Sequence, residues 1–242
     1  MLKYQNPQLT KYQKGAVMKH TTSFLLMGID SLSTITLLDT LAKQYAIILE
    51  SKDFVIKASH DNKATLHAFV DEVHTLFGAK LLLTTNLAKT ALTLLKNANQ
   101  KLSTAESCTG GLLAYEFTKI SGASEVFLGG VISYDNSIKE SWLSVDSQDL
   151  QSFGAVSEVV VSQMCKGILH LSGADFALAT SGIAGPNGGS AQKPVGLVYI
   201  GVQQRGNVAK IERHIFAGNR KSVQKQAAQT AILMLIREIL ES

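Results

Sequence analysis

The sequence predicts an α/β protein built from a small α+β unit over residues 22–85 and a larger layered α/β domain over residues 86–242. Two observations carry this prediction. The first part has the order β-α-β-β-α-β, and the second alternates strands with helices, which is typical of a layered α/β sheet. The last two strands are joined by Arg205-Gly206-Asn207, a hairpin signal, so we expect a mixed sheet.

The spacing of apolar residues in the small unit indicates where its helices and strands lie. Its second expected helix places Leu66, Phe69 and Val73 on one face. Ser51-Lys52-Asp53 separates two short apolar runs and predicts a hairpin. Expected strands cover 23–27, 46–49, 54–56 and 80–84, and expected helices cover 31–45 and 61–77.

In the larger domain, helix caps and the spacing of apolar residues indicate the elements. Asp135 or Asn136 can cap one helix, and Ser157 can cap another that has Glu158 in its first turn. The closing helix is amphipathic, with an apolar side that includes Ala227, Ala231 and Leu235. Expected strands cover 101–104, 126–134, 175–180, 195–203 and 210–216. Expected helices cover 86–97, 109–120, 136–143, 157–171 and 222–240.

The composition is that of a globular protein, with 45% hydrophobic and 17% charged residues. The net charge of +4 suits an anionic small molecule as well as nucleic acid. Two cysteines in different contexts favour a reducing cytoplasm, and no apolar run approaches the roughly 20 residues of a membrane span. Residues 1–21 are expected to be a solvated basic tail, and a nucleic-acid or membrane arm is the alternative.

Ser107 is the candidate nucleophile. It stands in Thr104-Ala105-Glu106-Ser107-Cys108-Thr109-Gly110-Gly111, between an expected strand and an expected helix. A serine on such a turn is well presented for attack, but it needs a base. None of the six histidines lies in a motif-like segment that would suit this role.

Lys139, 32 residues downstream, is the candidate base. Its ordinary pKa of about 10.4 would have to fall through burial or nearby positive charge, and its place in the first turn of a helix favours that. Tyr134 ends the preceding strand, so a Ser/Tyr/Lys cluster could pass a proton to a leaving amine. Backbone N–H groups of residues 108–110 would face the oxyanion. The alternative is a solvated lysine beside an aromatic at the edge of the core.

Cys108 is the rival nucleophile, because a thiolate at a helix N-terminus is activated. A buried cysteine that serves only packing is the alternative. Cys165, in the middle of a helix, is expected to serve packing.

A glycine-rich loop over 182–189 follows an apolar strand, and its backbone could approach a phosphate or ribose. It is not a P-loop, because no Gly-Lys-Ser/Thr ending follows. Lys193 and Arg220 could meet a phosphate, or could be solvated charges. No cluster of Asp, Glu, His and Cys has metal-ligand spacing, so we expect no metal and no cofactor.

Together these segments resemble the CinA C-terminal domain family over roughly residues 86–242. The resemblance rests on the serine motif at 104–111, Tyr134 to Lys139, Gly154-Ala155-Val156-Ser157-Glu158, the loop at 181–189 and Lys193-Pro194-Val195-Gly196.

The resemblance implies a three-layer α/β/α domain, commonly dimeric, that hydrolyses the carboxamide of nicotinamide mononucleotide without a metal. The products would be nicotinate mononucleotide and ammonia, in pyridine nucleotide salvage. Its catalytic residues fall on Ser107, Tyr134 and Lys139. Implied nucleotide contacts are Thr104, Glu106, Cys108, Thr109, Gly110, Gly111, Gly182, Ala184, Gly185, Asn187, Gly188, Lys193 and Arg220.

The chain departs from the family at its front. Residues 22–84 look like the small KH-like linker domain of CinA proteins, without the nucleotide-pyrophosphatase domain that precedes it in full-length members. The unit lacks the Gly-x-x-Gly loop of KH domains, so no nucleic-acid partner is expected. The alternative function is a nucleotide-binding regulatory protein that has lost catalysis, and a hydrolase of a different amide is a further one.

Overall fold

The computed structural model describes residues 19–241, and these residues form two compact units that divide between residues 85 and 86. The expected basic tail over residues 1–21 falls almost entirely outside the described residues.

The first unit is a four-stranded antiparallel sheet with the strand order β2-β3-β1-β4. Together with two helices this is the predicted split βαβ arrangement. Its core centres on Phe24, Leu38 and Phe69, each at most 1% exposed. The elements are β1 (His20–Leu26), α1 (Ser31–Gln44), β2 (Ile48–Lys52), β3 (Val55–His60), α2 (Lys63–Phe77), a 3₁₀ turn (Gly78–Lys80) and β4 (Leu81–Leu83).

The hairpin of this unit lies slightly later than expected. Its turn is at Asp53 and Phe54, where Asp53 has a left-handed φ of 56°, so Ser51 and Lys52 belong to β2. The β1–β3 pairing continues to His20 opposite His60, which makes both strands longer than their apolar runs. Backbone pairing therefore extends strands beyond the residues that the hydrophobic pattern marks.

The second unit has a five-stranded mixed sheet with the order β6-β5-β7-β8-β9. β5 (Leu102–Glu106) pairs in parallel with β6 (Phe127–Ile132) and β7 (Phe176–Gly182). β8 (Leu197–Gln204) and β9 (Lys210–Ile215) add an antiparallel hairpin. This confirms the predicted mixed sheet.

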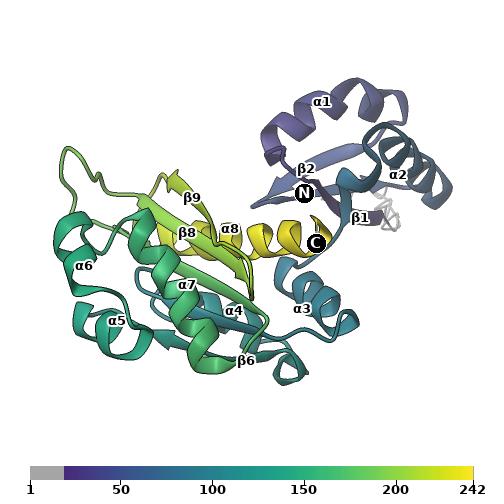
Figure 1. Ribbon diagram of the computed structural model, residues 1–242. Helices are drawn as coiled ribbons and strands as arrows, with labels where there is room; N and C mark the ends of the chain where they lie inside the picture. Colours follow the sequence, from purple (N-terminus) through teal and green to yellow (C-terminus); the bar gives the residue numbers. More distant parts are fainter. Residues whose placement is uncertain (1–18, 242) are drawn as a thin grey trace, which may run out of the picture. The chain divides into compact units, whose positions relative to one another are not determined.

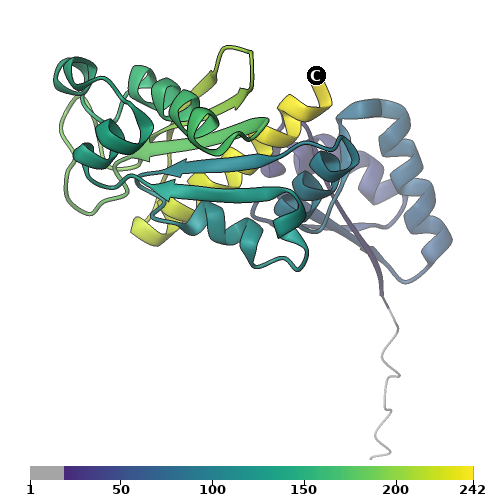
Figure 2. The ribbon, with the colours of Figure 1, turned by 60° about the horizontal axis from the view of Figure 1, so that its bottom comes forward.

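Helices cover both faces of this sheet and form three layers (Figures 1 and 2). One face carries α3 (Leu87–Asn97), α4 (Leu112–Thr118) and the long α8 (Arg220–Glu241). The other carries α5 (Asn136–Leu143), α6 (Ser147–Phe153) and α7 (Glu158–Ser172). A 3₁₀ turn (Ala123–Glu125) precedes β6.

Two local features of the second unit differ from what the sequence pattern predicts. The helix α6 was not predicted, because its Ser-Gln-Asp-Leu-Gln-Ser-Phe sequence buries only Leu150 and so has no apolar stripe. It is started by Asp146, whose carboxylate accepts hydrogen bonds from the N–H groups of Gln148 and Asp149. The helix α4 begins at Leu112, three residues later than expected, because the two preceding glycines adopt positive φ.

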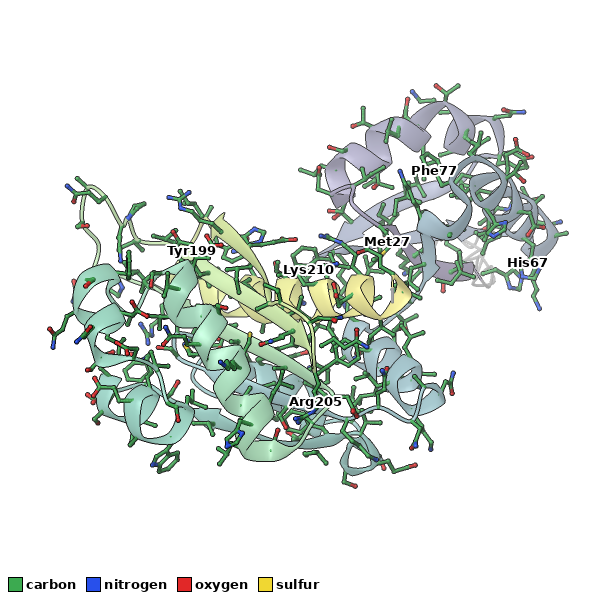
Figure 3. The ribbon with its side chains drawn as sticks, in the orientation of Figure 1. Met27, His67, Phe77, Tyr199, Arg205 and Lys210 are labelled. Atoms are coloured by element: carbon green, nitrogen blue, oxygen red, sulfur yellow. The ribbon has the colours of Figure 1, made fainter. Side chains whose placement is uncertain are left out.

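Arg205, at the turn after β8, ties the hairpin to the end of α7 (Figure 3). Its guanidinium donates hydrogen bonds to the carbonyls of Leu169 and Ala174, at 2.7 to 3.0 Å. The Leu169 carbonyl also accepts the N–H of Gly173, the residue that caps α7, so Arg205 adds a second, charged donor at this helix end.

Candidate functional site

The Ser107 turn lies at the carboxyl edge of the parallel strands, directly after β5. The Ser107 N–H donates to the carbonyl of Thr180 on β7, at 2.9 Å, and the Gly110 N–H closes the turn onto Ser107 O at 3.2 Å. Gly110 and Gly111 have φ of 62° and 96°, which side chains rarely adopt. The turn is therefore fixed by backbone bonds, and Ser107 is 9% exposed at its start.

Glu106 is a structural anion in this arrangement. Its carboxylate is 1% exposed and accepts hydrogen bonds from the N–H groups of Gly111, Leu113 and Ala114, at 2.7 to 3.0 Å. It thus occupies the place at the start of α4 where a ligand anion would bind. The Glu106 carboxylate is therefore engaged by the first turn of α4, and its expected contact with substrate stays a prediction.

Lys139 lies on α5 and is 1% exposed. Its Nζ donates to the carbonyl oxygens of Ser133, at 2.6 Å, and Tyr134, at 3.4 Å. Burial lowers the pKa of Lys139, against the opposing effects of the Asp135 carboxylate and the Cys108 thiol. Within the described chain, no hydrogen bond joins Lys139 to Ser107.

Tyr134 is hydrogen-bonded to Lys139 through its backbone carbonyl and not through its hydroxyl. Its ring is 62% exposed, and its hydroxyl accepts a hydrogen bond of 3.0 Å from Arg220. Arg220 also donates to the carbonyl of Gly185, at 3.0 Å, so it joins the end of β6 to the glycine-rich loop. The Tyr134 hydroxyl is therefore held by Arg220, and its role in a proton relay stays a prediction.

The backbone N–H groups that were expected to face the oxyanion differ in whether they already have an acceptor. Among the described residues, no oxygen accepts a hydrogen bond from the N–H of Cys108 or Thr109, whereas the Gly110 N–H is used within the turn. The turn is supported from α8 by Gln224, whose Nε2 donates to Cys108 O at 2.9 Å. No sequence pattern indicates this role for Gln224, since it is one glutamine in a long helix.

Cys108 is 4% exposed, and burial raises the pKa of its thiol to about 12. It is therefore a neutral thiol at physiological pH. Beside it, the hydroxyls of Thr109 and Thr180 share a buried hydrogen bond of 2.7 Å. Burial raises the pKa of Cys165 to about 12 as well, in the core under α7.

Two glycines of the glycine-rich loop pack closely against the side chain of Val195. A Cβ on Gly185, whose φ is 80°, would lie 2.5 Å from the Val195 side chain, and one on Gly189 would lie 3.0 Å from it. A Cβ on Gly182 would clash with the backbone of Leu197, at 2.6 Å. These glycines therefore serve close packing within the loop. The predicted contacts Asn187 and Gly188 are exposed at its outer part.

A cavity of about 630 Å³ opens beside this loop. Its wall includes two of the predicted contacts, Ala184 and Arg220, and neither Ser107 nor Lys139 lines it. Arg220 connects it to Tyr134, whose carbonyl accepts from Lys139. The start of α8 therefore forms part of the cavity wall. Its lining consists of Ala184, Pro186, Val195, Gly218, Asn219, Arg220 and Lys221.

Two predicted contacts lie elsewhere. Thr104 is 0% exposed in β5, and its Oγ1 faces Gly130, where a Cβ would come within 2.2 Å. Lys193 donates to the carbonyls of Phe153 and Val156, at 2.6 and 2.8 Å. The structure therefore buries Thr104 within the sheet and turns Lys193 toward the α6–α7 junction.

The part of the chain that the structure describes contains no group of three or more His, Cys, Asp and Glu placed to hold a metal ion. It also contains no helix long and apolar enough to cross a membrane.

Comparison with known proteins places this site in a family. The CinA C-terminal domain family matches residues 84–239. A "CinA-like protein" of Leptospira borgpetersenii is 39% identical over 182 residues, which cover 75% of this chain and 43% of the relative. That alignment is longer than residues 86–242 and so reaches into the first unit. A "CinA-like protein" of Syntrophomonas wolfei is 48% identical over 145 residues, covering 60% of this chain and 35% of the relative. The chain thus spans less than half the length of these relatives.

Solved structures agree with the sequence comparison. The competence/damage inducible protein CihA from Agrobacterium tumefaciens is 41% identical, with a TM-score of 0.61, and the match covers 62% of this chain and 92% of that one. A CinA superfamily protein from Enterobacter cloacae is 30% identical, with a TM-score of 0.60, over 64% of this chain and 94% of that one. The sequence match and the shared fold together establish that this chain belongs to the CinA C-terminal domain family.

Proposed function

We propose that this chain is an amidohydrolase that converts nicotinamide mononucleotide into nicotinate mononucleotide and ammonia. Ser107 Oγ attacks the carboxamide carbon while Lys139 takes its proton. The C–N bond then breaks, and ammonia leaves with that proton, relayed through Tyr134. Water hydrolyses the resulting ester and restores Ser107.

The observation that carries the proposal is the placement of Ser107 and Lys139. Ser107 follows β5, and Lys139 follows the adjacent parallel strand β6. The chain leaves β5 toward α4 on one face of the sheet and leaves β6 toward α5 on the other (Figure 1). Ligands of open α/β sheets bind at such a crevice, at the carboxyl ends of the strands.

The protonation state of Lys139 supports its role as a base. A lysine with an ordinary pKa is charged at neutral pH and cannot accept a proton, whereas burial lowers the pKa of Lys139. Its contacts are carbonyl oxygens, which leave the nitrogen free to lose its charge without breaking an ion pair. Catalytic hydrogen bonds are often long in free enzymes and tighten in the substrate complex, which is the step we expect between Lys139 and Ser107.

The nucleotide half of the substrate is proposed to lie in the cavity beside α8. Arg220 and Lys221 supply positive charge on its wall, and a guanidinium binds phosphate oxygens in a fixed geometry. The volume of about 630 Å³ is in the range of small-molecule sites. Binding of phosphate by Arg220 would release the Tyr134 hydroxyl, which the relay requires.

A nucleotide-binding regulatory protein without catalysis is the second candidate. The observation that favours it is that Lys139 Nζ is engaged by Ser133 and Tyr134 and does not contact Ser107. The homodimer and the cytoplasmic location expected from the sequence stay predictions.

The deciding experiment is ammonia release from nicotinamide mononucleotide by the purified chain, with Ser107→Ala alongside. Release by the wild type that is lost in the variant supports the amidase. Saturable binding of the nucleotide without release supports the regulatory protein. Ammonia release by Ser107→Ala at the wild-type rate rejects the serine mechanism.

A further inference from the structure

The motif Gly154-Ala155-Val156-Ser157 connects α6 to α7 and has no part in the proposed chemistry. Its carbonyl groups are nevertheless all engaged. Gly154 O accepts from Ser157 Oγ at 2.8 Å, and Ala155 O accepts from Ser181 Oγ, at the end of β7, at 2.7 Å. Val156 O accepts from Lys193. Two of these carbonyls therefore accept hydrogen bonds from outside the motif, one from the end of β7 and one from Lys193 in the segment that leads into β8.

Lys193 makes the longest-range of these contacts. Its Nζ donates to Phe153 O at 2.6 Å and to Val156 O at 2.8 Å, across 40 and 37 residues of chain. Phe153 is the last residue of α6, where carbonyls lack intrahelical partners and a cation is favoured. Gly154 makes room for it, since a Cβ there would lie 3.2 Å from Nζ, and its φ is 73°.

The glycine-rich residues belong to the loop that joins β7 to β8, and the same lysine closes a turn at residues 190–193 of this loop. Its N–H donates to Ser190 Oγ at 3.0 Å, and its carbonyl accepts from the Ser190 N–H at 2.8 Å. The base of the loop is closed separately, by hydrogen bonds of 2.8 Å from Ile183 N–H to Leu197 O and from Gly196 N–H to Ile183 O. Lys193 thus ties the part of the loop around residues 190–193 to the α6–α7 junction, while Arg220 holds the loop at Gly185.

We propose that Lys193 is a positioning residue that holds the glycine-rich loop closed and thereby sets the wall of the Arg220 cavity. The link is short, because Val195, two residues further on, lines that cavity and is enclosed by Gly185 and Gly189. Loss of the tether would free the loop and displace Val195. This consequence for substrate binding rests on the proposed function, whereas the tether itself does not.

The test compares Lys193→Met, which keeps the length of the side chain and removes its charge, with Lys193→Arg and with Gln192→Met. Gln192 is the exposed neighbour in the same loop and controls for a general effect of loop substitution. Hydrogen exchange followed by mass spectrometry is measured on the full chain. We expect Lys193→Met to speed exchange about tenfold in residues 183–196 and 153–157, since a hydrogen bond to a charged group holds at least that much. The rest of the second unit should keep the wild-type rates.

Kinetics supply the second readout. Lys193→Met should raise KM for nicotinamide mononucleotide about tenfold and change kcat less than threefold, with Lys193→Arg closer to wild type in both measurements. Wild-type exchange in Lys193→Met overturns the proposal, and a raised KM in that case would mean direct contact with substrate. Faster exchange with an unchanged KM overturns the positioning role. If the wild type releases no ammonia, the amidase proposal fails, and exchange together with the Kd of the nucleotide decides the role of Lys193.

Discussion

Lys139 donates a hydrogen bond of 2.6 Å to the backbone carbonyl of Ser133, the residue that follows β6. A buried ammonium is thereby paired with a neutral acceptor, and no carboxylate lies in a hydrogen-bonded position to hold its proton, within the residues described. Asp135, the nearest anion on its own segment, is occupied by Ser137. This arrangement leaves desolvation as the largest influence on the Lys139 pKa.

The pH dependence of stability follows from this relationship. The folded pKa of Lys139 is lowered below its unfolded value, so between the two values the unfolded chain binds more protons and stability rises with pH. Wild type should therefore gain stability relative to Lys139→Met as pH is raised toward the ordinary lysine pKa. Urea unfolding of both proteins at several alkaline pH values measures this, and a constant difference across the range would contradict it.

The pH dependence of activity has the same origin. If neutral Lys139 is the base, kcat/KM for ammonia release should rise with pH and level off below the ordinary lysine pKa. Lys139→Ala should lose at least about a thousandfold in kcat, and its residual activity should need a higher pH, because hydroxide must then take the serine proton. Glu140→Gln, an exposed neighbour on α5, is the control. A wild-type profile flat across the alkaline range would exclude Lys139 as the base.

The identity of the nucleophile is tested by two adjacent substitutions. Ser107→Ala should abolish turnover and retain nucleotide binding, since only the attacking oxygen is removed. Cys108→Ala should keep most of the activity, because burial raises the thiol pKa to about 12 and leaves almost no thiolate at neutral pH. The reverse result, with activity lost in Cys108→Ala and kept in Ser107→Ala, would transfer the role to the cysteine.

The fold and the candidate site could be predicted only in part from the sequence, as these same residues show. Ser107 and Lys139 could be singled out because a strand-to-helix turn and a helix start are local patterns, and both residues follow adjacent parallel strands. The side-chain directions of Thr104 and Lys193 could not be predicted, because they depend on tertiary partners such as Gly130 and Val156, and their contacts with the nucleotide stay predictions. Similarly, α6 has no apolar stripe and is held by its cap and by contact with α7.

The role of Glu106 as a cap of α4 can be tested separately from any role in substrate binding. Its buried carboxylate holds the first turn of α4 through three N–H groups, so Glu106→Gln should destabilise the domain by about 2–3 kcal/mol. The amide would also point donors at N–H groups. Glu140→Gln, on an exposed part of α5, should change stability by less than about 0.5 kcal/mol. Equal stability of the two variants in urea unfolding would refute the capping role.

Arg220 is the residue by which the phosphate end of the substrate can be tested. Arg220→Met removes the guanidinium that lines the cavity and contacts Gly185 and Tyr134. We expect KM for nicotinamide mononucleotide to rise about tenfold or more, because a charge-assisted hydrogen bond to phosphate is lost. Nicotinamide riboside has the same carboxamide and no phosphate, so its kcat/KM should change by less than about threefold in the variant. An equal loss with both substrates would mean that Arg220 acts on the reacting end, through the Tyr134 hydroxyl that it holds at 3.0 Å, and Tyr134→Phe should then reproduce it.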